Sequence, residues 1–344
     1  VLVSTDRGAT WREANGGLAS TPEAMAVRSV AVHPTDPKKV LRAGGAVIGG
    51  KHKSGLWLSD DGGASWKRLT TDIDFDGAGP TTLFGEVVAF ANAPKAETDV
   101  IVTAGESKGL FTSADGGKTW KSDFAGGKYF RDERITSILA DADLVIVGTF
   151  DDDEFETLGL GRPAIEAARA TVGRMYAAQL RPGGAIVVRR PPVELDHLGV
   201  TGAAVGYNHR FLSVATTRGI YFSHTGLAIM HKRRYRDLPA DACFLAMGHR
   251  RFLKLRKDTQ YDPKATCYAV PFTGPDAGRV HRVVERLTFD WNPVAKASRF
   301  PGTTCVLPDW KDKKIVYLCD LEGIHKSTDE GRTFGLVCKS PVKE

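Results

Sequence analysis

The sequence predicts an all-β protein made of repeated antiparallel hairpins. Three observations carry this prediction: an eight-residue motif that occurs four times, a regular spacing between its copies, and short apolar runs separated by polar turns along the 344 residues. Short strands with turn signals at regular intervals are typical of all-β folds. Repeats of this kind bury their hydrophobic faces by stacking on one another.

The repeated motif has the pattern Ser-x-Asp-x-Gly-x-(Ser/Thr)-(Trp/Phe) and occurs at Ser4–Trp11, Ser59–Trp66, Ser113–Trp120 and Ser327–Phe334. Each copy follows a short apolar run and ends in an aromatic residue that opens another, which is a hairpin signal. The Ser and Asp side chains can hydrogen-bond to the turn, the Gly can adopt a positive φ, and the aromatic ring can pack under the hairpin. We therefore expect structural roles for Ser4, Asp6, Gly8, Trp11, Ser59, Asp61, Gly63, Trp66, Ser113, Asp115, Gly117, Trp120, Ser327, Asp329, Gly331 and Phe334.

The spacing of the copies predicts the architecture. Their serines lie at positions 4, 59, 113 and 327, so the first two intervals are 55 and 54 residues and the last, 214, is about four such intervals. A period near 50 residues is typical of β-propeller blades. The long interval leaves room for three outer hairpins without a good motif, at Gly173–Ala177 with Pro182–Gly184, Gly219–Gly226, and Thr266–Val270 with Gly274–Gly278.

Six inner hairpins complete the count, against seven outer ones. They are Val27–Val32 with Lys39–Ala43, Glu86–Ala91 with Asp99–Ala104, Ile135–Leu139 with Leu144–Thr149, Gly202–Gly206 with Phe211–Thr216, Cys243–Met247 with Phe252–Leu255, and Thr304–Leu307 with Ile315–Cys319. We therefore expect residues 1–344 to form one domain, a seven-bladed β-propeller of four-stranded antiparallel blades. The chain would start inside a blade that is incomplete, its inner hairpin having been removed, lying disordered upstream, or never having existed.

Composition sets broad limits. A hydrophobic content of 42% suffices for a large core, and no apolar stretch is long enough to span a membrane. The net charge of +6 is modest and does not by itself indicate nucleic acid, which we do not expect as a partner. The chain begins at Val rather than Met, so a signal peptide could have been removed.

Five cysteines fall in the last third of the chain, without a Cys-x-x-Cys pair, which argues against a zinc ribbon or a c-type haem. We expect free thiols, with one disulfide in the last two blades as the alternative. The sequence does not indicate an oligomeric state.

Long segments between the hairpins are expected to share one face of the propeller, opposite the motif turns. Such loops on a rigid scaffold usually carry binding. The segments are 45–54, 69–85, 121–134, 151–171, 189–199, 256–265 and 286–302.

A possible ion site lies in the second of these segments, where Asp72, Asp74 and Asp76 alternate before Gly77. Alternating carboxylates can converge on one side of a loop, and hard oxygen ligands suit Ca²⁺. The run resembles a calcium-binding loop but departs from the EF-hand pattern, because Leu83 occupies the twelfth position. The alternative is a polar loop without an ion. No other cofactor is expected.

Two further stretches are charged. Residues 151–171 form an insertion that starts with the acidic run 151–156 and continues into a short helix from Pro163. The acidic run is either a solvated loop or part of a site. Basic residues gather between 231 and 257 and could bind an acidic protein or a glycan, although strand alternation would divide them between two faces. The candidate binding residues are Arg233, Arg234, Arg236, Arg250 and Arg251.

The repeated motif resembles the Asp-box (BNR) repeat. In the families that carry it, the box lies on the turn between the third and fourth strands of a propeller blade, away from the active site. Those families include sialidases, xyloglucan hydrolases, sortilin-type receptors and a photosystem assembly factor. The resemblance therefore implies a structural role for the box, favours a secreted or periplasmic location, and does not choose one function.

Enzymatic chemistry of the sialidase type is not expected, because the Arg-Ile-Pro signature of sialidases is absent: Arg134-Ile135 is followed by Thr136. Xyloglucan hydrolases resemble the chain more, but they place their carboxylates across a cleft between two propellers. A glycosidase needs an acid and a base on either side of the bond that it breaks. The first acids to test would be Asp72, Asp74, Asp151 and Asp152.

A non-catalytic binding module or scaffold needs fewer assumptions, with a protein or glycan ligand on the long-loop face. The alternative is a glycoside hydrolase of the Asp-box propeller type that acts on a polysaccharide. A close carboxylate pair with raised pKa on that face would favour the hydrolase, whereas arginine and aromatic side chains would favour binding.

Overall fold

The computed structural model describes residues 1–18, 27–33, 36–48, 51–69, 88–91, 100–105, 109–122, 133–141, 144–151, 175–180, 186–189, 200–205, 212–216, 219–223, 231–232, 245–249, 266–271, 276–284, 292–295, 298–303, 305–309 and 312–340. These ranges contain strands and turns and no helix, so the all-β prediction is confirmed for the described part of the chain. A membrane-spanning helix is accordingly not found among these residues.

The chain divides into two compact units. The first comprises Val1–Ser4, Arg12–Ala167 and Thr171–Val200, and the second comprises Thr5–Trp11, Ala168–Ala170 and Thr201–Glu344. The expectation of a single domain over residues 1–344 stays a prediction.

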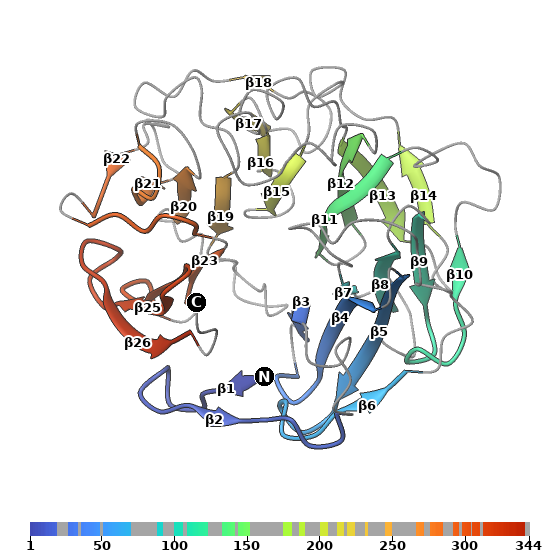
Figure 1. Ribbon diagram of the computed structural model, residues 1–344. Coiled ribbons are helices and arrows are strands. Elements are labelled where there is room, and N and C mark those ends of the chain that lie inside the picture. The colour runs from blue at the N-terminus through green and yellow to red at the C-terminus, as the bar shows by residue number, and fades with distance from the viewer. Residues whose placement is uncertain are drawn as a thin grey trace, which may run out of the picture. The chain divides into compact units, whose positions relative to one another are not determined.

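The first unit contains one two-stranded sheet and three four-stranded sheets, in which consecutive strands are antiparallel neighbours (Figure 1). The strands are β1 (Leu2–Val3) and β2 (Arg12–Glu13); β3 (Val27–Val32), β4 (Val40–Ile48), β5 (Lys51–Ser59) and β6 (Lys67–Arg68); β7 (Val88–Ala91), β8 (Val100–Gly105), β9 (Gly109–Ser113) and β10 (Lys121–Ser122); and β11 (Glu133–Asp141), β12 (Leu144–Asp151), β13 (Met175–Leu180) and β14 (Ile186–Arg189).

The second unit contains three four-stranded sheets of the same sequential order. Their strands are β15 (Val200–Val205), β16 (Leu212–Thr216), β17 (Gly219–Ser223) and β18 (His231–Lys232); β19 (Leu245–His249), β20 (Thr266–Pro271), β21 (His281–Val284) and β22 (Asn292–Pro293); and β23 (Cys305–Pro308), β24 (Val316–Cys319), β25 (Gly323–Ser327) and β26 (Gly335–Lys339). Four antiparallel strands per repeat agree with the expected blades, while the number of seven blades stays a prediction.

Apolar side chains of neighbouring sheets pack together in shared core clusters. In the first unit, Leu41 and Leu56 of the β3–β6 sheet share a core cluster with Phe90 and Ile101 of the β7–β10 sheet. In the second unit, Tyr268 and Val270 share one with Val316 and Leu318. Successive residues of a strand point to opposite faces, so each sheet can bury apolar residues on both. A fully buried leucine contributes about 1.5–3 kcal/mol to such a core.

Residues that flank the two-stranded β1–β2 sheet pack against the β3–β6 sheet. Val1 and Leu18 lie against the buried cluster of Val40, Trp57 and Trp66. The Trp66 indole N–H donates to the Ala14 carbonyl at 2.9 Å. This contact joins the first hairpin to the second motif turn.

Two strand assignments differ from the sequence prediction. The expected loop 45–54 is mostly strand, because β4 and β5 stay paired as far as Ile48 and Lys51; Ala46, Val47 and Ile48 extend the apolar run and favour this pairing. Thr266–Pro271, expected in an outer hairpin, is hydrogen-bonded directly to β19 and is therefore the second strand of its sheet. The apolar run from Thr266 correctly indicated a strand, but the place of that strand in its sheet depends on which strand it is hydrogen-bonded to.

Candidate functional site

Each motif turn is closed by its own Ser and Asp side chains. In the second copy, Ser59 Oγ accepts the Gly63 N–H at 2.8 Å and donates to Asp61 Oδ1 at 2.8 Å. Asp61 in turn accepts the Ser65 N–H at 2.8 Å and the Ser65 hydroxyl at 2.5 Å. Gly63 has a φ of +88°, a conformation that favours glycine. The Ser and Asp side chains of the motif therefore provide hydrogen-bond acceptors for the backbone N–H groups of the turn.

The same bonds recur in the other copies. Ser113 Oγ and Ser327 Oγ each accept a glycine N–H at 2.8 Å. Asp115 and Asp329 accept the hydroxyls of Thr119 and Thr333. In the first copy, Asp6 accepts the Thr10 N–H at 2.9 Å and its hydroxyl at 2.5 Å.

These hydrogen bonds keep the motif carboxylates ionised. The Ser65 hydroxyl and N–H and the Ser59 hydroxyl lower the pKa of Asp61 to about 2. Burial raises the pKa of Asp115 and Asp329, but the threonine and serine hydrogen bonds outweigh it and bring each pKa to about 2. An acid this strong holds no proton at neutral pH, so these groups are unsuited to general-acid catalysis.

In the second unit, two of the motif turns are hydrogen-bonded by tyrosine side chains that come from other sheets. Arg7 and Glu330 occupy the same motif position with φ of 59° and 63°. The Tyr317 hydroxyl donates to the Arg7 carbonyl at 3.0 Å, and the Tyr268 hydroxyl donates to the Glu330 carbonyl at 3.1 Å. Arg282 adds an ion pair to Glu330 at 2.6 Å.

Most of the other predicted site residues lie outside the described residues. These are Asp72, Asp74, Asp76, Asp152, Arg233, Arg234, Arg236, Arg250 and Arg251, together with the insertion beyond Asp151. Asp151 ends β12, opposite Glu133 of β11.

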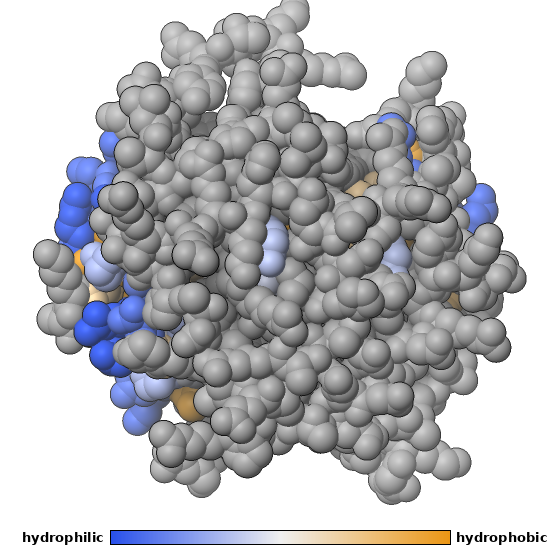
Figure 2. Space-filling model, turned by 90° about the horizontal axis from the view of Figure 1, so that it is seen from above, coloured by the Kyte–Doolittle hydropathy of each residue, from blue (hydrophilic) through white to orange (hydrophobic). Residues whose placement is uncertain are grey.

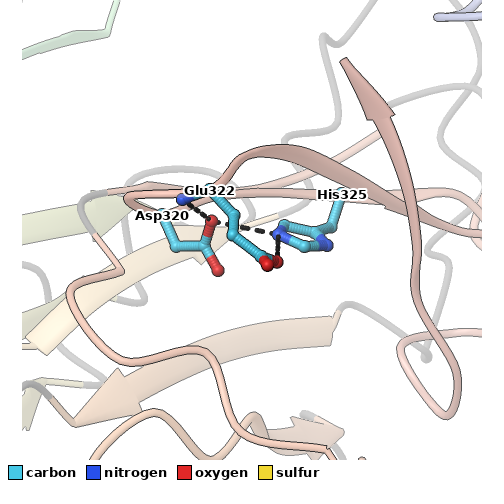
Figure 3. A group of neighbouring side chains, drawn as sticks. All are labelled: Asp320, Glu322 and His325. Carbon is cyan, nitrogen blue, oxygen red and sulfur yellow. Dashed lines mark hydrogen bonds and ion pairs between the residues drawn. The ribbon is translucent and has the colours of Figure 1, made fainter. Parts of the chain in front are cut away.

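A cluster that the sequence reasoning missed lies at the turn between β24 and β25. Asp320, Glu322 and His325 each offer a ligand-type atom, and these atoms lie within 4.8 Å of one another (Figure 3). Asp320 Oδ1 is 3.0 Å from His325 Nε2 and also accepts the backbone N–H groups of Glu322 and Gly323. Glu322 Oε2 is 3.9 Å from the same nitrogen. The available sequence signal was the spacing Asp-x-Glu-x-x-His.

The hydrogen bonds of this cluster close the turn between β24 and β25. His325 is buried, with its ring edge-on to Phe300 at 5.0 Å between centroids. Asp320 Oδ1 is occupied by three hydrogen bonds, the usual way in which an aspartate closes a hairpin turn. An imidazole with two carboxylates is also a donor set that Zn²⁺ accepts. Figure 3 shows that these three residues interact with one another: Asp320 and Glu322 each direct a carboxylate oxygen toward the same ring nitrogen of His325.

An apolar row is exposed on β3, the inner strand of the β3–β6 sheet. Val27, Val30 and Val32 are 42%, 50% and 57% exposed. Val30 pairs with Arg42 and Val32 pairs with Val40, so the row lies on the same face as Val40, whose cluster Val1 and Leu18 contact. In the view of Figure 2, by contrast, the described side chains at the rim are mainly hydrophilic.

Comparison with known proteins gives a fold and not a family. No protein-family model matches the chain, and no curated protein matches it in sequence. Among solved structures, an ancestral GH74 enzyme is 16% identical with a TM-score of 0.59 over 95% of this chain and 37% of its own. The chain thus spans little more than a third of the length of that enzyme.

Two structures that are not described as enzymes are similar at a somewhat lower identity and TM-score. YCF48 bound to D1 peptide is 12% identical, with a TM-score of 0.53 over 93% of this chain and 85% of its own. Sqt1 from Chaetomium thermophilum is 12% identical, with a TM-score of 0.53 over 93% of this chain and 73% of its own. These likenesses support a β-propeller fold for the chain.

Proposed function

We propose that the chain is a non-catalytic β-propeller module that binds a polypeptide ligand. The observation that carries the proposal is the exposed row of Val27, Val30 and Val32. Aliphatic side chains match apolar residues of a peptide, whereas glycan sites rely more on polar and aromatic groups. An exposed contiguous apolar patch usually marks an interaction site.

The state of three motif carboxylates supports a structural role over a catalytic one for the motif. Asp61, Asp115 and Asp329 have pKa values of about 2 and are engaged in turn hydrogen bonds. We therefore assign the motif residues a structural role. The likeness to YCF48, whose structure contains a D1 peptide, adds a precedent for peptide binding on this fold.

The proposal includes a second binding surface, the face that the long segments between the hairpins are expected to share. We infer that Arg233, Arg234, Arg236, Arg250 and Arg251 favour acidic partners and that nucleic acid is not the ligand. Binding through these arginines would weaken as salt screens the charges. A secreted or periplasmic location belongs to the same proposal.

Calcium is proposed as a ligand of Asp72, Asp74 and Asp76, by the alternation of these carboxylates. Added calcium should then raise the melting temperature of the wild type, and Asp74→Asn should abolish the gain. A wild-type melting curve that does not respond to calcium would contradict the site.

A glycoside hydrolase is the alternative, favoured by the likeness to the ancestral GH74 enzyme. The acids to test first are Asp72, Asp74, Asp151 and Asp152. Because a glycosidase needs two carboxylates across the scissile bond, Asn variants of these acids should abolish any cleavage.

One experiment separates the two functions. The purified chain is applied to an immobilised peptide array and to a glycan array, and the glycans are analysed for shortened products after long incubation. We expect peptide binding that Val30→Asp abolishes and that Leu336→Asp, at an exposed leucine on β26, leaves intact. Shortened glycans would establish the hydrolase instead, and peptide binding insensitive to Val30→Asp would exclude the β3 row as the site.

A further inference from the structure

Two cysteines face each other on neighbouring strands of the last sheet. Cys305 begins β23 and Cys319 ends β24, and the register places them directly opposite. At the other end of this strand pair, the Asp309 N–H donates to the Ile315 carbonyl at 2.9 Å. Paired positions alternate along antiparallel strands, so Cys305 and Cys319 form a hydrogen-bonded pair, whose Cα atoms are about 5.5 Å apart. That separation lies within the range of about 4.4–6.8 Å found in disulfides.

Both thiols are on the less buried face of the sheet. Val316 and Leu318 of β24 point into the core, whereas Tyr317 and Cys319, which alternate with them along the strand, are only half-buried. Cys305 is half-buried in the same way, beside the buried Val306. The pair therefore lies on the face of the sheet opposite the core residues Val306, Val316 and Leu318.

A third cysteine lies in the same row but out of reach. Cys338 of β26 is opposite Ile324 of β25, and Ile324 is opposite Cys319. Two strand spacings separate Cys338 from Cys319, which is roughly 10 Å. Of the three cysteines whose side chains the structure describes, Cys305 is thus the one placed to pair with Cys319.

A side-chain hydrogen bond also joins the two thiols. The two sulfur atoms therefore lie against each other, as a disulfide requires.

We propose that Cys305 and Cys319 are a redox-active dithiol, which a small disulfide converts into a cross-strand disulfide that staples β23 to β24. The thiolate of one cysteine attacks one sulfur of the small disulfide; the S–S bond of the small disulfide breaks, and one small thiolate leaves and takes up a proton. The other cysteine then loses its proton and attacks the sulfur of the first, and the second small thiol leaves. Two protein thiols are oxidised by two electrons while one small disulfide is reduced to two thiols.

The test uses the full chain and glutathione disulfide, with peptide mass mapping of all five cysteines. In the wild type, we expect a Cys305–Cys319 disulfide and no lasting adduct on either residue. Cys305→Ser should retain a glutathione adduct at Cys319, because the resolving thiol is gone. Cys319→Ser should in the same way retain a glutathione adduct at Cys305, and Cys338→Ser should behave as the wild type.

Other outcomes would overturn the proposal. They are a disulfide that includes Cys338 in place of either partner, or a stable adduct on Cys305 or Cys319 of the wild type. Wild-type mapping alone decides the pairing, so the test stands even if a variant fails to fold.

Discussion

At the scale of the residue, the motif aspartates work as hydrogen-bond acceptors that are stronger when ionised. The pKa of Asp115 and Asp329 is about 2 in the folded chain, against an ordinary value of 3.8. A carboxyl group whose pKa is lowered by folding stabilises the folded state wherever it is ionised in both states. This stabilisation is complete above the ordinary value and is lost as the pH falls toward the folded value.

Acid should therefore weaken the motif turns between about pH 4 and pH 2. We expect Asp115→Asn to lower the urea midpoint at neutral pH and to reduce the loss of stability across that acid window. Asp60→Asn, at an exposed carboxyl in the variable second position of the second motif, is the matched control and should change neither quantity. Identical acid profiles for the wild type and Asp115→Asn would show that this carboxylate does not stabilise its turn.

Arg7 and Glu330 of the motif have long-range partners that a local sequence pattern does not reveal. Arg7 and Glu330 adopt left-handed backbone, where the second and third copies have Gly62 and Gly116. A non-glycine residue in this conformation costs about 1–2 kcal/mol. Each carbonyl is held by a tyrosine hydroxyl from a strand of another sheet, Tyr317 or Tyr268. The motif predicted the turn, but partners 310 and 62 residues away are set by tertiary packing.

At the scale of the element, the last aromatic residue of the motif differs between copies. Trp66 is 5% exposed and donates to Ala14, whereas Trp120 is only partly buried. The sequence predicted packing for both and could not rank them, because their burial depends on which sheet covers the turn.

Truncation of Trp66 should thus cost more than truncation of Trp120. We expect Trp66→Ala to lower the free energy of unfolding by about 3–5 kcal/mol, as for other buried aromatic residues. Trp66→Phe keeps a ring in place and should lose less, including about 0.5–1.5 kcal/mol for the hydrogen bond. Urea denaturation of the three variants measures the order, and a Trp120→Ala variant as unstable as Trp66→Ala would contradict it.

The cysteine pair makes a second prediction for an element, the β23–β24 hairpin. A disulfide that closes a loop of roughly 15 residues stabilises a protein by about 3 kcal/mol in the chain-entropy model. Oxidised wild type should therefore unfold at higher urea than reduced wild type. Cys338→Ser should show the same difference, whereas Cys305→Ser should show none, since it lacks the staple.

At the scale of the whole molecule, the sequence predicted more of the scaffold than of the site. Hairpin periodicity identified the four-stranded sheets, since local turn chemistry and alternation carry that information. It placed Thr266–Pro271 in the wrong position of its sheet and did not detect the Asp320–His325 contact, because strand order and side-chain convergence depend on long-range pairing. The exposed row of Val27, Val30 and Val32 was invisible for the same reason: an apolar strand reads alike whether or not a neighbour covers it.

The single-domain prediction also belongs to this scale and can be tested by native-state hydrogen exchange. If residues 1–344 unfold as one cooperative domain, the core amides of β4 in the first unit and β24 in the second exchange through the same global opening. Trp66→Ala, which acts in the first unit, should then lower the opening free energy of both strands equally. A loss confined to β4, with β24 unchanged, would mean that the two compact units unfold independently.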